Sequence, residues 1–249
     1  MAERYRVKVH AYALMENHLH MVLSTPEANL SAAMHWLETA YSIGFNRRYQ
    51  RVGPLFQGRF KAVLFEGPGE AWPITRYVHL NPVRVKALGL DRRSRQAEQL
   101  GGAAADDESE IGRRRDLLRL YPWSSYGCYA GFRPTPPWLY VEEVLGGEGE
   151  DQRRAYQAYV EERLGLEACE NPLEQAVGGL LLGSTDWVRG IQKRVTGDRR
   201  EQPAFRMVEW RPDWESVREA MERVRGERWE AFSERHGDWG RDMALYVLR

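Results

Sequence analysis

The first 24 residues alternate between apolar and polar positions, as strands do when one face of a sheet is buried. Residues 5–14 and 17–24 both show this period of two, and the few residues between them are enough for a tight connection. The pattern therefore predicts a β-hairpin, which ends where Ser24 is followed by a threonine and a proline.

Helical spacing begins at Leu30, where apolar residues recur every three or four positions as far as Tyr41. The predicted helix has Asn29 as its N-cap and ends near Arg48. A short strand is expected over residues 60–65.

The rest of the chain favours helices. One is predicted from Glu70 to Leu80, where Asn81-Pro82 interrupts it, and an aromatic turn (YPWSSY) is predicted at residues 121–126. Residues 91–116 are highly charged and lack large apolar residues, which predicts a flexible surface insertion. Further helices are expected over residues 151–164, 173–182, 185–195, 213–224 and 227–249.

Composition narrows the class of protein. The chain has no apolar run of the 18 or more residues that a membrane span needs, no apolar signal-peptide core, and only two cysteines, so we expect a cytoplasmic protein without a disulfide framework. Net charge is zero, but residues 1–90 carry 11 of the 36 basic and 6 of the 36 acidic residues, a net charge of +5. A basic N-terminal part is compatible with phosphate contacts.

Two pairs of residues could carry chemistry. His18 and His20 are two apart on a predicted strand, so both imidazoles project from one face and form half of a divalent-metal site. Tyr77 and Asn81 are four apart on a predicted helix, which places a phenol one turn from an amide oxygen. Each pair alone is more often ordinary surface or packing.

A third candidate region mixes positive charge with aromatic rings, which suits single-stranded or hairpin DNA, although a basic helix end beside core aromatics would look the same. Its basic residues are Arg47, Arg48, Arg51, Arg59 and Lys61, and its aromatic residues are Phe45, Tyr49, Phe56 and Phe60.

Taken together, these residues resemble a known family, the HUH endonucleases with one catalytic tyrosine, and specifically the REP-associated tyrosine transposases. The matching stretches are AYALMENHLHMVLSTP (11–26), FNRRYQRVGPLFQGRFKAVL (45–64), RYVHLNPVR (76–84) and YPWSSY (121–126), with later similarity in residues 153–164 and 179–191.

The resemblance implies an enzyme that nicks and rejoins single-stranded DNA through a 5′-phosphotyrosine. Tyr77 would be the nucleophile, and His18, His20 and Asn81 would hold Mg²⁺ or Mn²⁺. It also implies a nucleoid-associated protein whose DNA contacts come from Arg47, Arg48, Arg59, Lys61 and Arg84.

The implied fold is α+β, with a ferredoxin-like antiparallel sheet and helices in residues 1–140 and a mostly helical region in 141–249. The family has a strand and a helix before the segment that starts here at Tyr5, and residues 213–249 resemble only the start of a DnaA-type DNA-binding domain. We therefore expect truncation at both ends and an exposed sheet edge and apolar surface that favour homo-oligomers. The expected exposed residues are Val7, Val9, Leu19 and Met21.

Two rival hypotheses remain at this point. The chain could be an inactive remnant that only binds DNA, or a metal-dependent phosphodiesterase in which water replaces Tyr77 as the nucleophile. Tyr12 and Tyr41 are expected to be packed and Tyr49 to stack on a base, which leaves Tyr77 as the candidate nucleophile.

Overall fold

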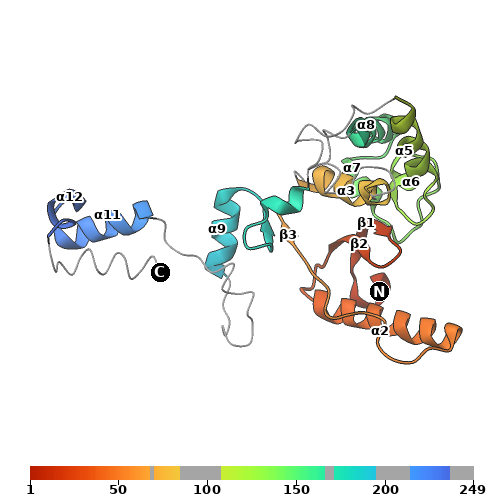
Figure 1. The fold of residues 1–249 in the computed structure, drawn as a ribbon, viewed down its shortest axis with the longest axis horizontal. Coiled ribbons are helices and arrows are strands. Elements are labelled where there is room, and N and C mark those ends of the chain that lie inside the picture. Colours follow the sequence, from red (N-terminus) through yellow and green to blue (C-terminus); the bar gives the residue numbers. More distant parts are fainter. Residues whose placement is uncertain (68–69, 85–107, 166–170, 195–213, 236–249) are drawn as a thin grey trace. The chain divides into compact units, whose positions relative to one another are not determined.

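The computed structural model describes residues 1–67, 70–84, 108–165, 171–194 and 214–235. The chain divides into two compact units, residues 1–183 and residues 184–249. The α+β class is confirmed, because the first unit packs helices around an antiparallel pair of strands and the described part of the second unit is helical (Figure 1).

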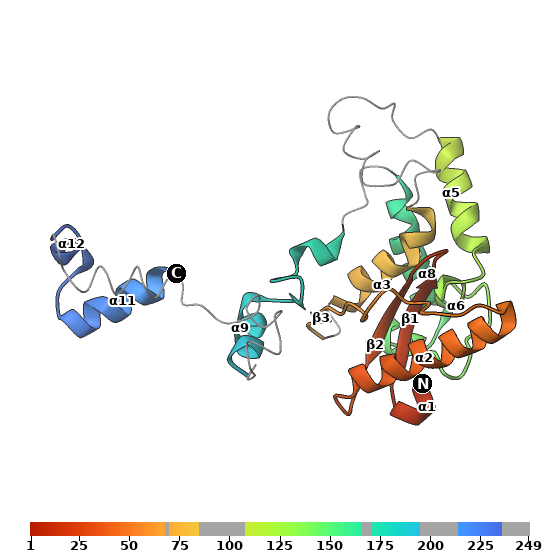
Figure 2. The same cartoon turned by 60° about the horizontal axis from the view of Figure 1, so that its bottom comes forward.

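The predicted hairpin is present as β1 (Lys8–Leu14) and β2 (Leu19–Ser24), which pair antiparallel (Figure 2). The first strand starts later than expected, because a short helix, α1 (Ala2–Tyr5), precedes it and ends at Arg6 in the left-handed conformation, at φ 52°. The register shifts between Val9 and Ala11, so the hairpin contains a bulge at His10.

One face of the hairpin is buried under α3 (Ala71–Leu80), which packs against both strands. The small side chains of Ala11 and Ala13 are fully buried on this face and let the helix approach the sheet closely. Val22 of β2 lies opposite Ala11 and joins the same core, so the alternation seen in the sequence correctly identifies the buried face.

The outer edge of β1 is not open, contrary to expectation. A distant segment pairs with it: the amide of Ser125 donates to the Tyr12 carbonyl at 3.0 Å, and the amide of Tyr140 donates to the Val9 carbonyl at 2.9 Å. Val7 and Val9, predicted as exposed apolar surface, are 1% and 5% exposed. The backbone groups of this edge are thereby satisfied within the chain.

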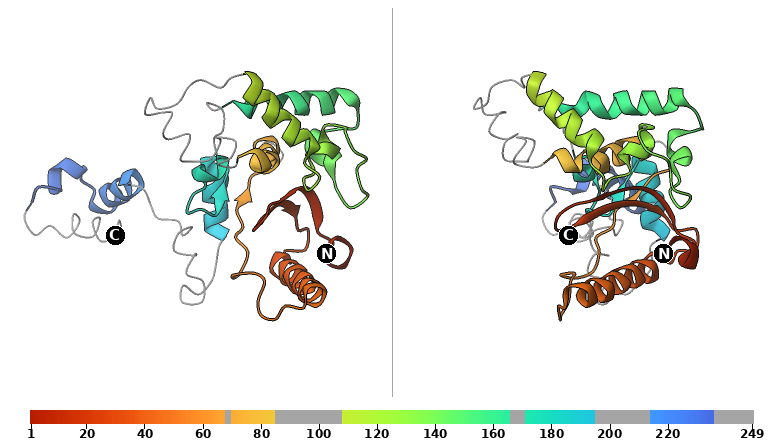
Figure 3. Two further views of the ribbon diagram at one scale, coloured as in Figure 1. Left: turned by 45° about the vertical axis from the view of Figure 1, so that its right-hand side comes forward. Right: turned by 90° about the vertical axis from the view of Figure 1, so that its right-hand side faces the viewer.

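The long helix α2 (Leu30–Tyr49) lies on the side of the hairpin opposite α3 (Figure 3). Asn29 is the N-cap residue of this helix, as predicted, but its side-chain oxygen accepts no cap hydrogen bond; its side-chain nitrogen donates to the Tyr5 carbonyl at 2.9 Å. Its buried residues, Ala33 and Met34, lie in its first half. Tyr41, expected to be packed, is 57% exposed.

Two other predictions for the first unit need correction. Residues 173–182 are not a helix, because Gly178 and Gly179 adopt positive φ angles of 61° and 69°. They form a 3₁₀ turn, η6 (Pro172–Gln175), and a strand, β4 (Leu181–Leu182), which pairs in parallel with β3 (Leu64–Phe65). The expected strand at 60–65 is thus reduced to its last two residues.

The predicted insertion at 91–116 is in part a packed helix. Residues 91–107 lie outside the described residues, but residues 108–116 belong to α5 (Glu108–Leu120), in which Arg114 is buried and donates to the Leu164 carbonyl at 2.9 Å. A high content of charged residues did not make this part a flexible insertion, because a buried arginine can be stabilised by a backbone acceptor.

The remaining helices of the first unit complete the cover over the core, which also contains Tyr126, Tyr129 and Tyr156. They include the expected helix at 151–164, which the structure divides in two. Their bounds are η2 (Asn81–Val83), α6 (Tyr126–Tyr129), α7 (Val141–Leu145), α8 (Glu150–Glu161) and η4 (Glu162–Leu164).

The second unit contains α9 (Thr185–Arg194) and α11 (Trp214–Arg225), where helices are predicted. Of the helix predicted over residues 227–249, only α12 (Trp229–Phe232) is helical among the described residues, and residues 236–249 lie outside them. Val217, Met221 and Phe232 form a small apolar cluster between α11 and α12. Across the described ranges, no helix combines the length and the apolar character that crossing a bilayer requires.

Candidate functional site

The two histidines predicted to share a face do so at the start of β2. Their Nε2 atoms are 3.1 Å apart, and their ring planes are nearly perpendicular, at 83°. Two nitrogens bound at about 2.1 Å to adjacent corners of one octahedral ion would be separated by roughly 3 Å. The spacing of His18 and His20 therefore fits two ligands of a single cation.

The neighbouring groups set the tautomer of His18 and lower the pKa of His20. The Asn17 side-chain oxygen accepts from His18 Nδ1 at 2.7 Å, so neutral His18 carries its proton on Nδ1 and leaves the Nε2 lone pair exposed. Burial lowers the pKa of His20 to about 4, and electrostatic interaction with His18 and with the positive charge of Arg84 acts in the same direction. A neutral imidazole is the form that binds a metal.

Tyr77 projects from α3 toward the histidines. Its ring centroid is 5.7 Å from that of His20, with the rings nearly perpendicular at 85°. The guanidinium carbon of Arg84 lies 5.0 Å from the Tyr77 centroid, over the ring. The Tyr77 ring therefore stands beside both a histidine and a guanidinium group.

Asn81 occupies the first position of η2, one turn beyond Tyr77. Pro82 does not displace it from helical geometry, since its φ and ψ are −54° and −40°. Its side-chain nitrogen donates to the Tyr77 carbonyl at 2.8 Å, which fixes the amide and leaves the side-chain oxygen as the atom able to ligate.

The donors at this site fit a cation with open positions better than a closed structural metal site. Among the described residues, no group of three His, Cys, Asp or Glu side chains gathers as a metal site. His18 and His20 bring two imidazole nitrogens together, and two such ligands leave open positions on a cation for substrate oxygens and water. Asn81 is the third ligand that the resemblance implies; its side chain is held by the Tyr77 carbonyl, and its role as a ligand stays a prediction.

The predicted basic and aromatic residues of α2 also gather. Tyr41, Phe45 and Tyr49 follow one another along the helix, and Phe56 contacts Tyr41 with centroids 6.2 Å apart. We call these four rings the aromatic ladder. Tyr49 is 57% exposed, and Arg47 and Arg48 are exposed beside it in the last turn. The Asn46 side chain donates to the Gly53 carbonyl at 2.9 Å and holds the following loop against the helix.

The arginines near Tyr77 are separated by the structure. Arg76, the residue before Tyr77, stacks over Tyr159 at 3.9 Å and contacts Glu162 at 3.4 Å. It is therefore occupied by α8 and η4, while Arg84 is the arginine that faces Tyr77. Arg59 and Lys61 are exposed in the segment that follows α2.

Sequence reasoning missed two supporting features. Asn17 orients His18, and its position directly before the histidine was the only signal. His79 is fully buried behind the site, where its ring nitrogens meet the Tyr156 hydroxyl at 2.8 Å and the Ser125 hydroxyl at 2.7 Å. No local pattern reveals that network, because its partners lie 46 and 77 residues away.

Comparison with known proteins gives one match. Residues 1–81 match the family model described as "Transposase IS200 like", and this range contains His18, His20, Tyr77 and Asn81. No curated protein and no solved structure matches the chain. The match covers about a third of the sequence. The N-terminal segment that carries the histidine pair and Tyr77 is thus similar to the IS200-like transposases, which supports a relationship to that transposase family.

Proposed function

We propose that this protein nicks and rejoins single-stranded DNA, with Tyr77 as the nucleophile. The observation that carries the proposal is the juxtaposition of a metal-spaced histidine pair with a phenol, at 3.1 Å between the histidine nitrogens and 5.7 Å between the His20 and Tyr77 rings. The transposase match over residues 1–81 gives this geometry a reaction class.

The chemistry follows from the residues present. The Tyr77 oxygen attacks a backbone phosphorus, a P–O bond to the tyrosine forms, and the bond to the 3′ oxygen breaks. The products are a 5′-phosphotyrosine and a free 3′-hydroxyl, and attack by a 3′-hydroxyl reverses the step. Because the covalent link preserves the phosphodiester energy, rejoining needs no ATP.

His18, His20 and Asn81 would hold Mg²⁺ or Mn²⁺, which supplies charge to polarise the scissile phosphate. A phenol with an ordinary pKa near 10 is a poor nucleophile at neutral pH. We assign to Arg84 the role of stabilising negative charge on the Tyr77 oxygen, because its guanidinium lies over that ring. Asn81 has a second role, because its side-chain nitrogen donates to the backbone carbonyl of Tyr77 and holds that helical turn in place.

The test is a covalent-adduct gel with hairpin-flanked single-stranded DNA and Mn²⁺. Wild-type protein should give a slow-migrating protein–DNA species. Tyr77→Phe keeps the ring and removes only the attacking oxygen, so the adduct should vanish while DNA binding and Mn²⁺ affinity stay unchanged. Cleavage that persists in Tyr77→Phe would mean that water is the nucleophile and that the protein is a phosphodiesterase.

Binding of the metal can be measured separately from DNA cleavage. Calorimetric titration of Mn²⁺ should show binding to wild type and at least a tenfold loss in the His18→Ala/His20→Ala variant, of the size that ligand-shell losses cause. A double replacement of His35 and Tyr49, both exposed and outside this site, serves as the matched control. If wild type binds DNA but forms no adduct on any such strand, the protein is a DNA-binding remnant without catalysis.

A further inference from the structure

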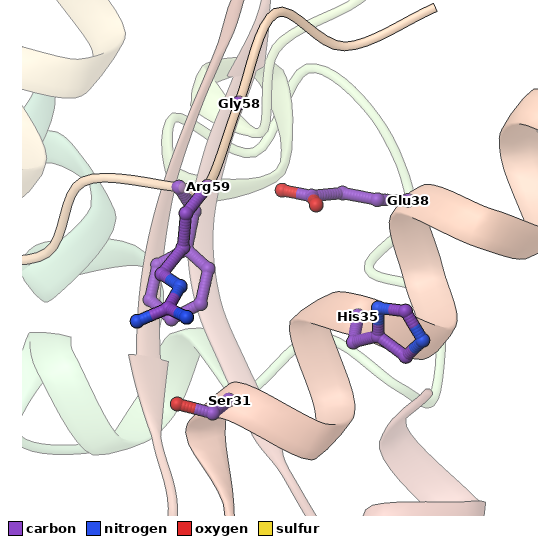
Figure 4. A pocket seen from close by; sticks show the side chains of 6 residues that line it. Ser31, His35, Glu38, Gly58 and Arg59 are labelled. Atoms are coloured by element: carbon purple, nitrogen blue, oxygen red, sulfur yellow. The ribbon is translucent and has the colours of Figure 1, made fainter. Parts of the chain in front are cut away.

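A hollow lies on the opposite side of the hairpin from Tyr77. Helix α2 and the segment 58–60 enclose a partly open hollow of about 420 Å³ (Figure 4). This volume falls within the range of pockets that accept small organic groups, roughly 300–1,000 Å³. The residues around it are Ser31, His35, Glu38, Gly58, Arg59 and Phe60.

The helix contributes three polar side chains from one face. Ser31, His35 and Glu38 are spaced four and three residues apart, which stacks them along the same side of α2. The opposite wall is not helical, and there Gly58 is in an extended conformation that brings the backbone past the helix. The Glu38 carboxylate points from the helix toward that wall in Figure 4.

The two walls carry opposite charges that do not neutralise each other. Glu38 lines the hollow from the helix and Arg59 lines it from the facing segment. Neither side chain forms an ion pair or a side-chain hydrogen bond with any residue in the described ranges. An acceptor and a donor group are thus both available to one ligand placed between them.

We propose that this hollow binds an unpaired guanine base of the single-stranded DNA, an inference that rests on the proposed function. Guanine carries two adjacent donors, N1–H and the N2 amine, which match the two oxygens of a carboxylate such as Glu38. Its O6 and N7 atoms are acceptors and form the commonest specific contact of arginine, which Arg59 provides. The aromatic ring of Phe60 offers a face on which the base stacks.

The other bases fit this pair of charges poorly. Adenine and cytosine each place an acceptor nitrogen beside their amine, and an ionised carboxylate repels it. Thymine flanks its one N–H with two carbonyl oxygens. In a duplex, the donor edge of guanine is occupied by cytosine, so the hollow reads only single strands.

The experiment measures equilibrium binding of the full chain by fluorescence anisotropy, with a chelator present so that cleavage does not occur. The probes are thymidine oligonucleotides that carry one guanine, inosine or adenine at the centre. The base of inosine, hypoxanthine, differs from guanine only by lacking the N2 amine. We expect wild type to bind the guanine strand about tenfold more tightly than the other two, as for one lost base contact.

Glu38→Gln should abolish this preference while retaining the weaker binding, because the amide places a donor against the guanine donors. Glu3→Gln removes an equal charge at an exposed site of α1 outside the hollow and should leave the preference intact. Phe60→Leu should weaken binding of all three strands together. Circular dichroism checks that each variant is folded.

Wild type that binds all three strands equally would overturn the guanine inference alone and leave the proposed nicking activity standing. A preference that survives in Glu38→Gln would also overturn it, because the residues that recognise guanine would then lie outside the hollow. Failure of wild type to bind any strand would overturn both proposals, whereas loss of the covalent adduct with the preference retained would overturn only the proposed function.

Discussion

At the scale of single residues, the position of the candidate site depends on buried residues behind it. His79 follows Tyr77 by two positions but points into the core, where it joins Tyr156 and Ser125. Ser125 in turn accepts from the Tyr12 amide at 2.9 Å, so the network ties α3, which carries Tyr77, to the hairpin that carries the histidine pair. The buried imidazole is therefore a structural anchor for the site.

This anchor makes stability depend on pH. Burial lowers the pKa of His79 to about 3, against 6.5 for a free histidine. Below pH 6.5 the unfolded chain takes up a proton that the folded chain refuses, so the free energy of unfolding falls as pH falls toward 3. From pH 7 to pH 5 the loss due to His79 is about 2 kcal/mol.

Urea unfolding of wild type and His79→Gln at these two pH values, with a chelator present, checks the prediction. His10 and His20 also have lowered pKa values and contribute in the same direction in both proteins. The difference between wild type and His79→Gln in how much the free energy of unfolding changes with pH therefore isolates the contribution of His79. An equal change in the two proteins would contradict the prediction, because the pKa of His79 would then be the same in the folded and the unfolded chain.

At the scale of elements, α2 performs two separate tasks along its length. Its first half supplies the buried Ala33 and Met34 and the polar wall of the hollow. Its second half exposes two rings of the aromatic ladder, Tyr41 and Tyr49, and two arginines. A helix that only packed would bury one face throughout. The exposed rings beside positive charge are typical of a surface that stacks on bases and tracks phosphates.

The arginines at the end of α2 should therefore contribute to the salt dependence of DNA binding. In Arg47→Ala/Arg48→Ala, two phosphate contacts are lost, and the slope of log affinity against log salt should become shallower by about 1.4 for single-stranded DNA. Anisotropy titrations over a range of salt concentrations measure this slope.

The control for this measurement is Arg6→Ala/Arg154→Ala, which removes the same charge from exposed arginines paired with Glu27 and Glu150. Its slope should equal that of wild type. An unchanged slope in the Arg47→Ala/Arg48→Ala variant would show that these two arginines remain solvated in the complex.

At the scale of the whole molecule, the hairpin is asymmetric in its cover. The outer edge of β1 is paired by residues 123–125 and 139–140, whereas β2 has β1 as its sole strand partner among the described residues. Leu19 and Met21 of β2 remain half-buried on the face away from α3. The expected exposure is thus confined to β2.

We expect self-association through this remaining surface, because an unpaired strand edge beside apolar side chains is costly in water. Sedimentation at micromolar concentration should show a dimer or larger species. Met21→Lys should shift it toward monomer, whereas Leu120→Lys, at a side chain that is 79% exposed on α5, should not. A wild-type protein that sediments as a monomer throughout would contradict the prediction.

The sequence by itself determined the local elements and the residues that share their faces. A period of two places His18 and His20 on one side of a strand, and a spacing of four places Tyr77 and Asn81 on one turn, because these periods are properties of the backbone. The roles of these four residues follow from the family resemblance and stay predictions. The α+β class, which the resemblance implied, is confirmed.

Only the tertiary structure decided how distant segments meet. The cover of β1 by residues 123–125, the pairing of β3 with β4 and the placement of His20 beside Tyr77 all depend on how the chain folds back on itself. The hollow between α2 and Arg59 also depends on how these two segments pack together. Such contacts leave no periodic signal, since their free energy comes from burial and pairing between residues whose separation along the chain is arbitrary.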